Sequence, residues 1–148
     1  MAKTVVAFGA FDLIHPGHLH YLEDASRYGN LIVVVARDST ISDLTGKKPF
    51  INENARLEII KAIKFVHTAV LGEKIKRWND FYDILRIFDP DYIALGYDQK
   101  VDIGYLKRYL RTGGYRAKIV RIKPYHSKLY NTSRLERWEQ PAFSNEIS

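Results

Sequence analysis

The chain of 148 residues contains no cysteine, which excludes disulfide bonds and thiol catalysis. It also lacks an apolar run long enough to cross a membrane, and no signal-peptide pattern precedes its first apolar segment. These absences agree with a cytoplasmic protein that has no membrane partner. The hydrophobic fraction of 46% over this length is enough for one domain with a core of its own.

Positive charge is in excess over most of the chain. The formal net charge is +6, and the last fourteen residues contribute −2, so that residues 1–134 carry +8. Such an excess fits an anionic ligand or a nucleic acid, although a solvated basic surface explains it as well. The basic residues form no long run interleaved with aromatic residues. We therefore expect no nucleic-acid partner.

Apolar segments typical of strands alternate with helical patterns along the chain. The strand candidates are residues 5–8, 31–36, 68–71, 92–95 and 119–122. The alternation predicts a doubly wound α/β fold with a parallel five-stranded sheet, in which ligands bind at the carboxyl ends of the strands. We expect one domain over residues 1–135, followed by a polar tail at 136–148.

Helical patterns fill the gaps between these strands. The first predicted helix follows the motif at residues 15–18 and has Leu19, Leu22 and Ala25 on one face. The second runs through 57–63 and is capped by Asn52, and the third runs through 81–88 and is capped by Asn79 or Asp80. The fourth runs through 103–110 and ends at Gly113. Residues 36–49, after the second strand, show no such pattern and are expected to form a loop.

The most informative motif is the segment GAFDLIHPGH at residues 9–18, where the first strand is followed by a helix. His15 and His18 lie close to the helix N-terminus, which offers unpaired backbone N–H groups and the positive end of the helix dipole. Such a place suits a phosphate, and two imidazoles there can donate hydrogen bonds to a polyphosphate. Exposed loop histidines or a helix cap are the plainer explanations.

A zinc site is not expected around these histidines. Their spacing does not match the HExxH pair of a helical zinc site, and the chain has no cysteine. The other histidines are His20, His67 and His126. We therefore expect no metal site built from protein side chains alone.

The segment resembles the HxGH signature of the nucleotidyltransferase superfamily, whose members join a nucleoside triphosphate to a phosphorylated acceptor and release pyrophosphate. The resemblance covers about residues 4–135 and implies a Rossmann-like fold with His15 and His18 as catalytic residues. It also assigns to the nucleotide site the residues around them: Ala10, Phe11, Pro16 and Gly17. Ala10 stands where the family usually has threonine, so position 10 offers a ligand its backbone alone.

Further site residues are expected after the second and fourth strands. The resemblance assigns Lys47, Lys48 and Arg56 to the acceptor or to phosphate, and lysine suits this role as a flexible point charge. Asp98 follows the fourth strand in the segment GYDQ and can accept hydrogen bonds from ribose hydroxyls or a base amine. A solvated loop, a solvated arginine and an ordinary Gly-Asp turn are the competing structural explanations.

A second phosphate-binding element is expected near the C-terminus. Residues 125–135 resemble the superfamily's Ser/Thr-rich helix start, in which Thr132 and Ser133 would offer hydroxyl and N–H groups to the nucleotide. A plain helix cap explains these two residues equally well. Tyr125 is expected to wall the base pocket, and a packed core tyrosine is the alternative.

Within the superfamily, the runs 34–38, 46–49 and 96–99 are most similar to those of small archaeal FAD synthases, which transfer AMP from ATP to FMN. The chain is also similar to bacterial glycerol-3-phosphate cytidylyltransferases, which use CTP. The archaeal group often carries a cysteine pair near its C-terminal phosphate element, and this chain has none. FMN is the expected acceptor, and its ring would need an apolar wall that the sequence does not locate.

The resemblance implies an in-line displacement at the α-phosphorus of the nucleotide, with catalysis by positioning and charge stabilisation. A divalent cation, Mg²⁺, is expected to bind together with the nucleotide. A catalytically inactive nucleotide-binding module is the hypothesis from another class. The sequence does not fix the oligomeric state, and a homodimer stays open.

Overall fold

The computed structural model describes residues 2–74 and 82–125. Five strands form one sheet in the order β3-β2-β1-β4-β5, and every neighbouring pair is parallel. The strands are β1 (Thr4–Gly9), β2 (Asn30–Val35), β3 (Thr68–Leu71), β4 (Tyr92–Leu95) and β5 (Lys118–Arg121). The predicted five-stranded doubly wound fold is confirmed, with β2 and β5 each starting and ending one residue earlier than expected.

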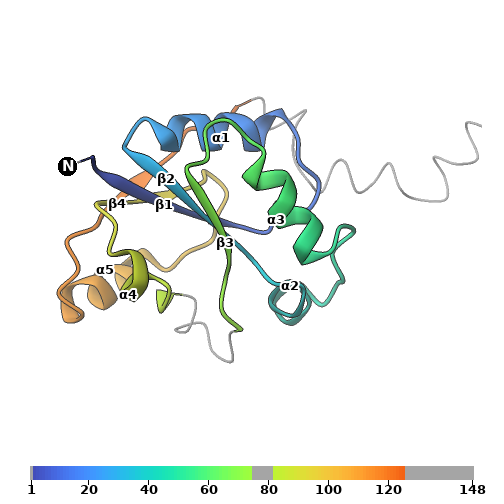
Figure 1. Ribbon diagram of the computed structural model, residues 1–148. Coiled ribbons are helices and arrows are strands. Elements are labelled where there is room, and N and C mark those ends of the chain that lie inside the picture. The colour runs from blue at the N-terminus through green and yellow to red at the C-terminus, as the bar shows by residue number, and fades with distance from the viewer. Residues whose placement is uncertain (1, 75–81, 126–148) are drawn as a thin grey trace, which may run out of the picture.

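Helices cover both faces of this sheet (Figure 1). One face carries α1 (Pro16–Ser26) and α3 (Glu53–Lys61), and the other carries α4 (Leu85–Phe88) and α5 (Ile103–Thr112). Because successive side chains of a strand point to opposite faces, each strand feeds both cores. In β1, for example, Val5 lies in the core under α1, and Val6 lies in the core under α5.

Two of the predicted helix ends are confirmed. The side chain of Asn52 accepts a hydrogen bond from the backbone N–H of Ala55 at 2.9 Å and caps α3. Helix α5 ends at Thr112, directly before Gly113. Its start is capped by Asp102, whose carboxylate accepts from Tyr105 N at 2.9 Å.

Other local predictions were wrong. The expected loop after β2 contains a helix, α2 (Asp38–Thr45), which ends at Gly46 in the left-handed conformation with φ 72°. No side chain of its own first residues caps α2. Instead, the carboxylate of Glu53, from α3, accepts a hydrogen bond from Asp38 N at 3.1 Å. A long-range contact therefore completes the helix start.

The helix predicted through 81–88 is shorter than expected. Its described part is a turn from residue 82 followed by α4, which ends where Asp89 takes a φ of 35° before Pro90. Leu19, expected on the buried face of α1, is 37% exposed. The proposed caps Asn79 and Asp80 and the expected domain boundary at 135/136 lie outside the described residues.

The topology fixes where a ligand can bind. Strand β1 lies in the middle of the sheet, and the chain crosses to β2 on one side and to β4 on the other. Ligands of doubly wound sheets bind at such a switch point, beyond the carboxyl ends of the strands.

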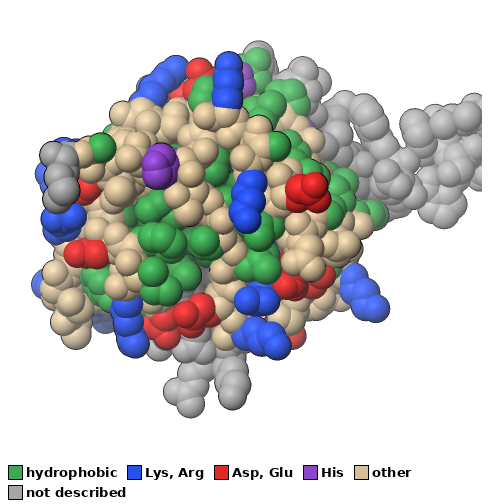
Figure 2. All heavy atoms as spheres, viewed as in Figure 1, with side chains coloured by type: hydrophobic (Ala, Val, Ile, Leu, Met, Phe, Trp, Pro, Cys, Tyr) green, Lys and Arg blue, Asp and Glu red, His purple; other side chains and the backbone are tan. Residues whose placement is uncertain are grey.

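Figure 2 shows exposed apolar side chains in the middle of the viewed face, around edge strand β3, with charged side chains around them. Within the described residues, no helix has the length and apolar character needed to span a membrane.

Candidate active site

A cavity of about 490 Å³ lies at the switch point. Its walls come from the β1–α1 turn, from α2 and the turn after it, and from the segments that follow β4 and β5. It brings together nine residues that the sequence nominated: Ala10, Phe11, His15, Gly17, His18, Lys47, Lys48, Asp98 and Tyr125. Pro16 forms the first position of α1, and Thr132 and Ser133 lie outside the described residues.

The two histidines cap the helix that follows them. The Nδ1 atom of His15 accepts a hydrogen bond from Gly17 N at 3.0 Å, and the Nδ1 atom of His18 accepts from His15 N at 3.3 Å. Together they form a capping box at the start of α1, with Pro16 at its first position. The plainer explanation of a helix cap is thus correct, and it does not compete with a catalytic role.

This cap fixes the protonation of both rings. A backbone N–H can only donate, so each Nδ1 must be an unprotonated acceptor, and each neutral ring carries its proton on Nε2. Burial and, to a smaller extent, the neighbouring His15 ring together lower the pKa of His18 to about 3. Burial also lowers the pKa of His15, against an opposing effect of Asp98. Near neutral pH the pair therefore offers two neutral Nε2–H donors.

Phe11 supports this pair from the β1–α1 turn. Its ring packs edge-on against His18 with centroids 5.7 Å apart and stacks on Tyr21 at 6.4 Å. The backbone of Phe11 has a φ of 52°, which is unusual for a residue with a large side chain. A Cβ atom at Gly9 would lie 2.7 Å from the Phe11 ring. Glycine at position 9 thus makes room for the ring.

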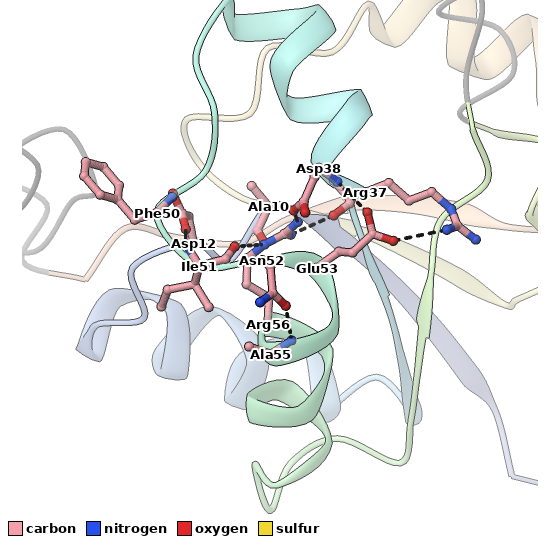
Figure 3. A network of polar contacts seen from close by, with 11 residues as sticks. Ala10, Asp12, Arg37, Asp38, Phe50, Ile51, Asn52, Glu53, Ala55 and Arg56 are labelled. Carbon is pink, nitrogen blue, oxygen red and sulfur yellow. Dashed lines mark hydrogen bonds and ion pairs between the residues drawn. The ribbon is translucent and has the colours of Figure 1, made fainter.

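Asp12 lines the cavity, and both of its carboxylate oxygens are bound by the fold. It is 8% exposed, and its two carboxylate oxygens accept hydrogen bonds from Phe50 N and Ile51 N, each at 2.9 Å (Figure 3). These bonds fasten the segment that follows Lys47 and Lys48 to the histidine turn. Asp12 therefore helps to fix the position of the segment that carries both lysines.

Arg56 lies inside the fold, and not at the cavity where the sequence suggested a ligand contact. Its side chain is fully buried and donates to Ala10 O at 2.7 Å, to Ala36 O at 2.6 Å and to Ile51 O at 2.8 Å. It also pairs with Asp38 at 2.7 Å (Figure 3). A buried guanidinium with these partners joins the ends of β1 and β2 to the start of α3, and it offers no surface to a phosphate. Neither the assignment to phosphate nor the alternative of a solvated arginine describes this position.

The segment after β4 is a tight turn whose backbone is held from three sides. Gln99 N donates to Gly96 O at 3.2 Å, and the Gln99 side chain accepts from Gly96 N at 2.8 Å and donates to Phe8 O at 2.7 Å. Arg121 donates to Gly96 O at 2.9 Å and to Gln99 O at 3.0 Å. The turn therefore presents the exposed carboxylate of Asp98 to the cavity.

Sequence analysis missed several residues at this site. Gln99 and Arg121 brace the turn, and Lys123 adds a third lysine to the cavity wall. Ile122 continues the pairing of β5, because its N–H donates to Leu95 O at 2.8 Å. Lys123 follows directly, and this position at a strand end is the sequence signal that could have identified it. Among the described residues, Lys47, Lys48 and Lys123 form no ion pair with a carboxylate.

Tyr125 closes one wall of the cavity. Its ring stacks on that of His20, from α1, with centroids 3.5 Å apart and an interplanar angle of 16°. It also lines the cavity, so it is neither a loose surface residue nor a member of the two cores. Its role as the wall of a base pocket stays a prediction.

Comparison with known proteins gives these features a family. A family model described as cytidylyltransferase-like matches residues 6–137. A curated FAD synthase of Methanohalophilus mahii is 43% identical over 133 residues, which are 88% of this chain and 89% of that protein. A curated FAD synthase of Thermoplasma acidophilum is 42% identical over 90% of this chain and 91% of its own.

A solved structure from Thermoplasma volcanium, described as a lipopolysaccharide core biosynthesis protein, has the same fold. It is 41% identical to this chain, covers 84% of it and 99% of itself, and superimposes with a TM-score of 0.76. The family model spans the turn with the two histidines, and the relatives and the solved structure each match 84–90% of the chain. The chain belongs to the cytidylyltransferase-like family of nucleotidyltransferases.

Proposed function

We propose that this protein transfers AMP from ATP to FMN and so forms FAD and pyrophosphate. The observation that carries the proposal is the pair of neutral Nε2–H donors that the capping box of α1 fixes at a cavity with three lysines. The curated relatives named FAD synthase, which match this chain at 42–43% identity over about nine-tenths of its length, support FMN and ATP as the substrates.

The proposed reaction is a single in-line displacement. A phosphate oxygen of FMN attacks the α-phosphorus of ATP, a new P–O bond forms, and the bond from the α-phosphorus to the bridging oxygen of the β-phosphate breaks. Negative charge grows on the oxygens around the α-phosphorus and on the leaving pyrophosphate. His15 and His18 donate hydrogen bonds to these oxygens, which stabilises the transition state more than the ground state.

The residues at the cavity fit a magnesium ion that arrives with the triphosphate. No group of three or more His, Asp or Glu side chains in the described part of the chain can hold a metal ion. Both oxygens of Asp12 accept backbone hydrogen bonds. Asp98 is therefore the other carboxylate in the cavity wall that could contact the hydrated ion. Mg²⁺ keeps most of its waters and needs few protein ligands. When bound, it neutralises charge on the phosphates.

The turn after β4 supplies the nucleoside end of the proposed site. Asp98 accepts hydrogen bonds from the ribose hydroxyls or from the base amine, and Tyr125 covers the base. Lys47 and Lys48 bind the acceptor phosphate. They lie on the other side of the histidines from Asp98 and Tyr125. Arg121 and Gln99 do not touch the nucleotide in this account, because their polar groups hold the turn.

Product analysis tests the proposal. The protein is incubated with Mg²⁺ and each pairing of ATP or CTP with FMN or glycerol 3-phosphate, and the products are separated by chromatography. We expect FAD and pyrophosphate from ATP with FMN. CDP-glycerol as the sole efficient product would replace this proposal with the cytidylyltransferase alternative. Binding of ATP and FMN without any product would support the inactive-module alternative instead.

A further inference from the structure

One wall of the cavity is apolar, although it lies next to two lysines. Ile41 is 9% exposed, yet it belongs to neither of the two cores that flank the sheet. It lines the cavity together with Thr45, one helical turn later, and with Pro49. An apolar side chain that is shielded from water outside the core, and faces a cavity, is available to a ligand with an apolar part.

The polar atoms of this wall are used within the wall itself. The Thr45 hydroxyl donates to Ile41 O at 2.7 Å and accepts from Lys47 N at 3.2 Å. Pro49 has no N–H to offer. Ile41, Thr45 and Pro49 therefore leave no unused polar side-chain group in this wall, and Lys47 and Lys48 are the polar side chains next to it in the sequence. Such a wall suits an apolar ring better than a sugar or a polyol, whose hydroxyls need hydrogen-bond partners.

The wall is also held in place before a ligand arrives. Helix α2 is capped at its start by Glu53 and ends at Gly46 with φ 72°, and Asp12 anchors the backbone just after Pro49. A site that is already formed loses less ordering entropy when its ligand binds. The apolar surface at Ile41 is therefore a fixed feature of the fold.

The topology decides which substrate reaches this wall. Helix α2 follows β2, and the Asp98 turn follows β4, so they lie on opposite sides of β1 and its histidines. In an in-line displacement the attacking and leaving oxygens lie on opposite sides of the phosphorus. If the nucleoside of ATP lies against Asp98, the acceptor extends toward α2.

We propose that the wall of Ile41, Thr45 and Pro49 binds the isoalloxazine ring of FMN, and that Ile41 determines specificity for a flavin over a small polyol phosphate. This inference rests on the proposed transfer of AMP to FMN and locates its acceptor. Glycerol 3-phosphate has no ring and leaves the wall uncovered, whereas the flavin ring covers it and removes apolar surface from water.

The test uses substitutions of Ile41 that keep the branched shape of the side chain. Ile41→Thr removes two carbon atoms and adds a hydroxyl to the wall, which should raise the Kd of FMN about fivefold, and Ile41→Val should raise it about twofold, because only the small exposed part of the side chain is lost to the ligand. Ile59→Thr on α3 is the matched control, since Ile59 is 38% exposed and does not line the cavity. Equilibrium dialysis with FMN alone measures the Kd, and thermal unfolding checks that each variant is folded.

Two further measurements separate this inference from the proposed function. The KM of ATP should stay within about twofold in Ile41→Thr, because ATP lies on the other side of the histidines. The Kd of glycerol 3-phosphate should likewise not respond to Ile41. If wild-type protein forms FAD while Ile41→Thr and Ile59→Thr bind FMN equally well, the ring lies elsewhere and the inference fails, although AMP transfer stands. If the wild-type protein binds FMN with the expected dependence on Ile41 but makes no FAD, the subsite stands and the proposed activity fails.

Discussion

Arg56 and Asp98 both lie near the carboxyl ends of strands, and the structure gives them opposite surroundings. Arg56 is fully buried and donates four hydrogen bonds to groups of β1, β2, α2 and α3 or the turns beside them. Asp98 is exposed at the cavity, on a turn whose backbone other residues hold. The first region, around Arg56, joins the carboxyl ends of β1 and β2 to the start of α3. The second, around Asp98, exposes its carboxylate at the cavity, where we propose that a nucleoside binds.

The comparison shows that a charged residue near a strand end is not by itself a ligand contact. Burial and the number of protein partners decide between the two roles. A buried charge whose partners are removed destabilises the fold strongly, whereas an exposed cavity charge contributes little to stability. Variants of the first region should therefore change unfolding, and variants of the second should change kinetics.

The largest effect on stability is expected for Arg56→Met. The substitution leaves the Asp38 carboxylate and three backbone carbonyls without their donor, and it should lower the free energy of unfolding by about 3–5 kcal/mol. Urea denaturation measures this change. Arg27→Met is the control, because the Arg27 side chain is 70% exposed and pairs within one helix, and it should cost at most about 1 kcal/mol. Equal stability of the two variants would contradict the structural role of Arg56.

The next largest effect is expected at His15, where the cap and the donor can be separated. His15→Asn keeps a side-chain acceptor for Gly17 N but loses Nε2–H, so turnover should fall about 100-fold or more with little change in stability. His15→Ala should lose the same turnover and about 1 kcal/mol of stability as well. Near-normal turnover in the folded Asn variant would remove His15 from the chemistry. His67→Asn, at an exposed position that does not line the cavity, serves as the control for a histidine change.

A smaller effect is expected at Asp98. If its carboxylate holds the nucleoside, Asp98→Ala should raise the KM of ATP about tenfold while changing turnover less, as loss of uniform binding does. Unfolding should match that of wild type, because the turn is held by Gln99 and Arg121. Asp43→Ala, an exposed change on α2 away from the cavity lining, is the control. Unchanged ATP affinity by calorimetry would make Asp98 a turn residue only.

The smallest effect is expected from pH. Because burial lowers the pKa of His18 to about 3, with a smaller contribution from His15, and also lowers the pKa of His15 itself, both rings are neutral above the ordinary histidine pKa of 6.5, and kcat should not follow a titration with that midpoint. The change of folding stability with pH has a defined sign. The unfolded chain binds protons near the ordinary pKa of 6.5 and the folded chain does not, so stability should fall as pH drops below that value toward 3. A kcat profile with an inflection near 6.5 that disappears in His15→Asn would contradict neutral donors.

Much of this site could be predicted from the sequence. Strong apolar runs gave the five strands, and their parallel order brought the histidines, Lys47, Lys48 and Asp98 to one cavity. Prediction failed where tertiary contacts decide. The start of α2 is capped by Glu53 from another helix, so the sequence of α2 alone does not indicate a helix. Whether Arg56 is solvated or buried depends on carbonyl groups of β1 and β2 that no local pattern reveals.

The apolar wall for the acceptor shows the same limit. The sequence indicated that a flavin needs such a wall but could not locate it, because no local pattern marks it. The structure shows Ile41, from α2, in the cavity wall, and we propose that it contacts the flavin. Local pattern therefore predicts which strand ends meet, and packing between elements decides which side chains remain for the ligand.

The transfer itself is tested most directly by following the phosphorus atoms of ATP. The protein is incubated with FMN, Mg²⁺ and ATP labelled at either the α- or the γ-phosphorus, and the label is located after chromatography. We predict that the α-label appears in FAD and the γ-label in pyrophosphate, in equal amounts. Label from the γ-position in a flavin product, or release of ADP in place of pyrophosphate, would contradict AMP transfer at this site.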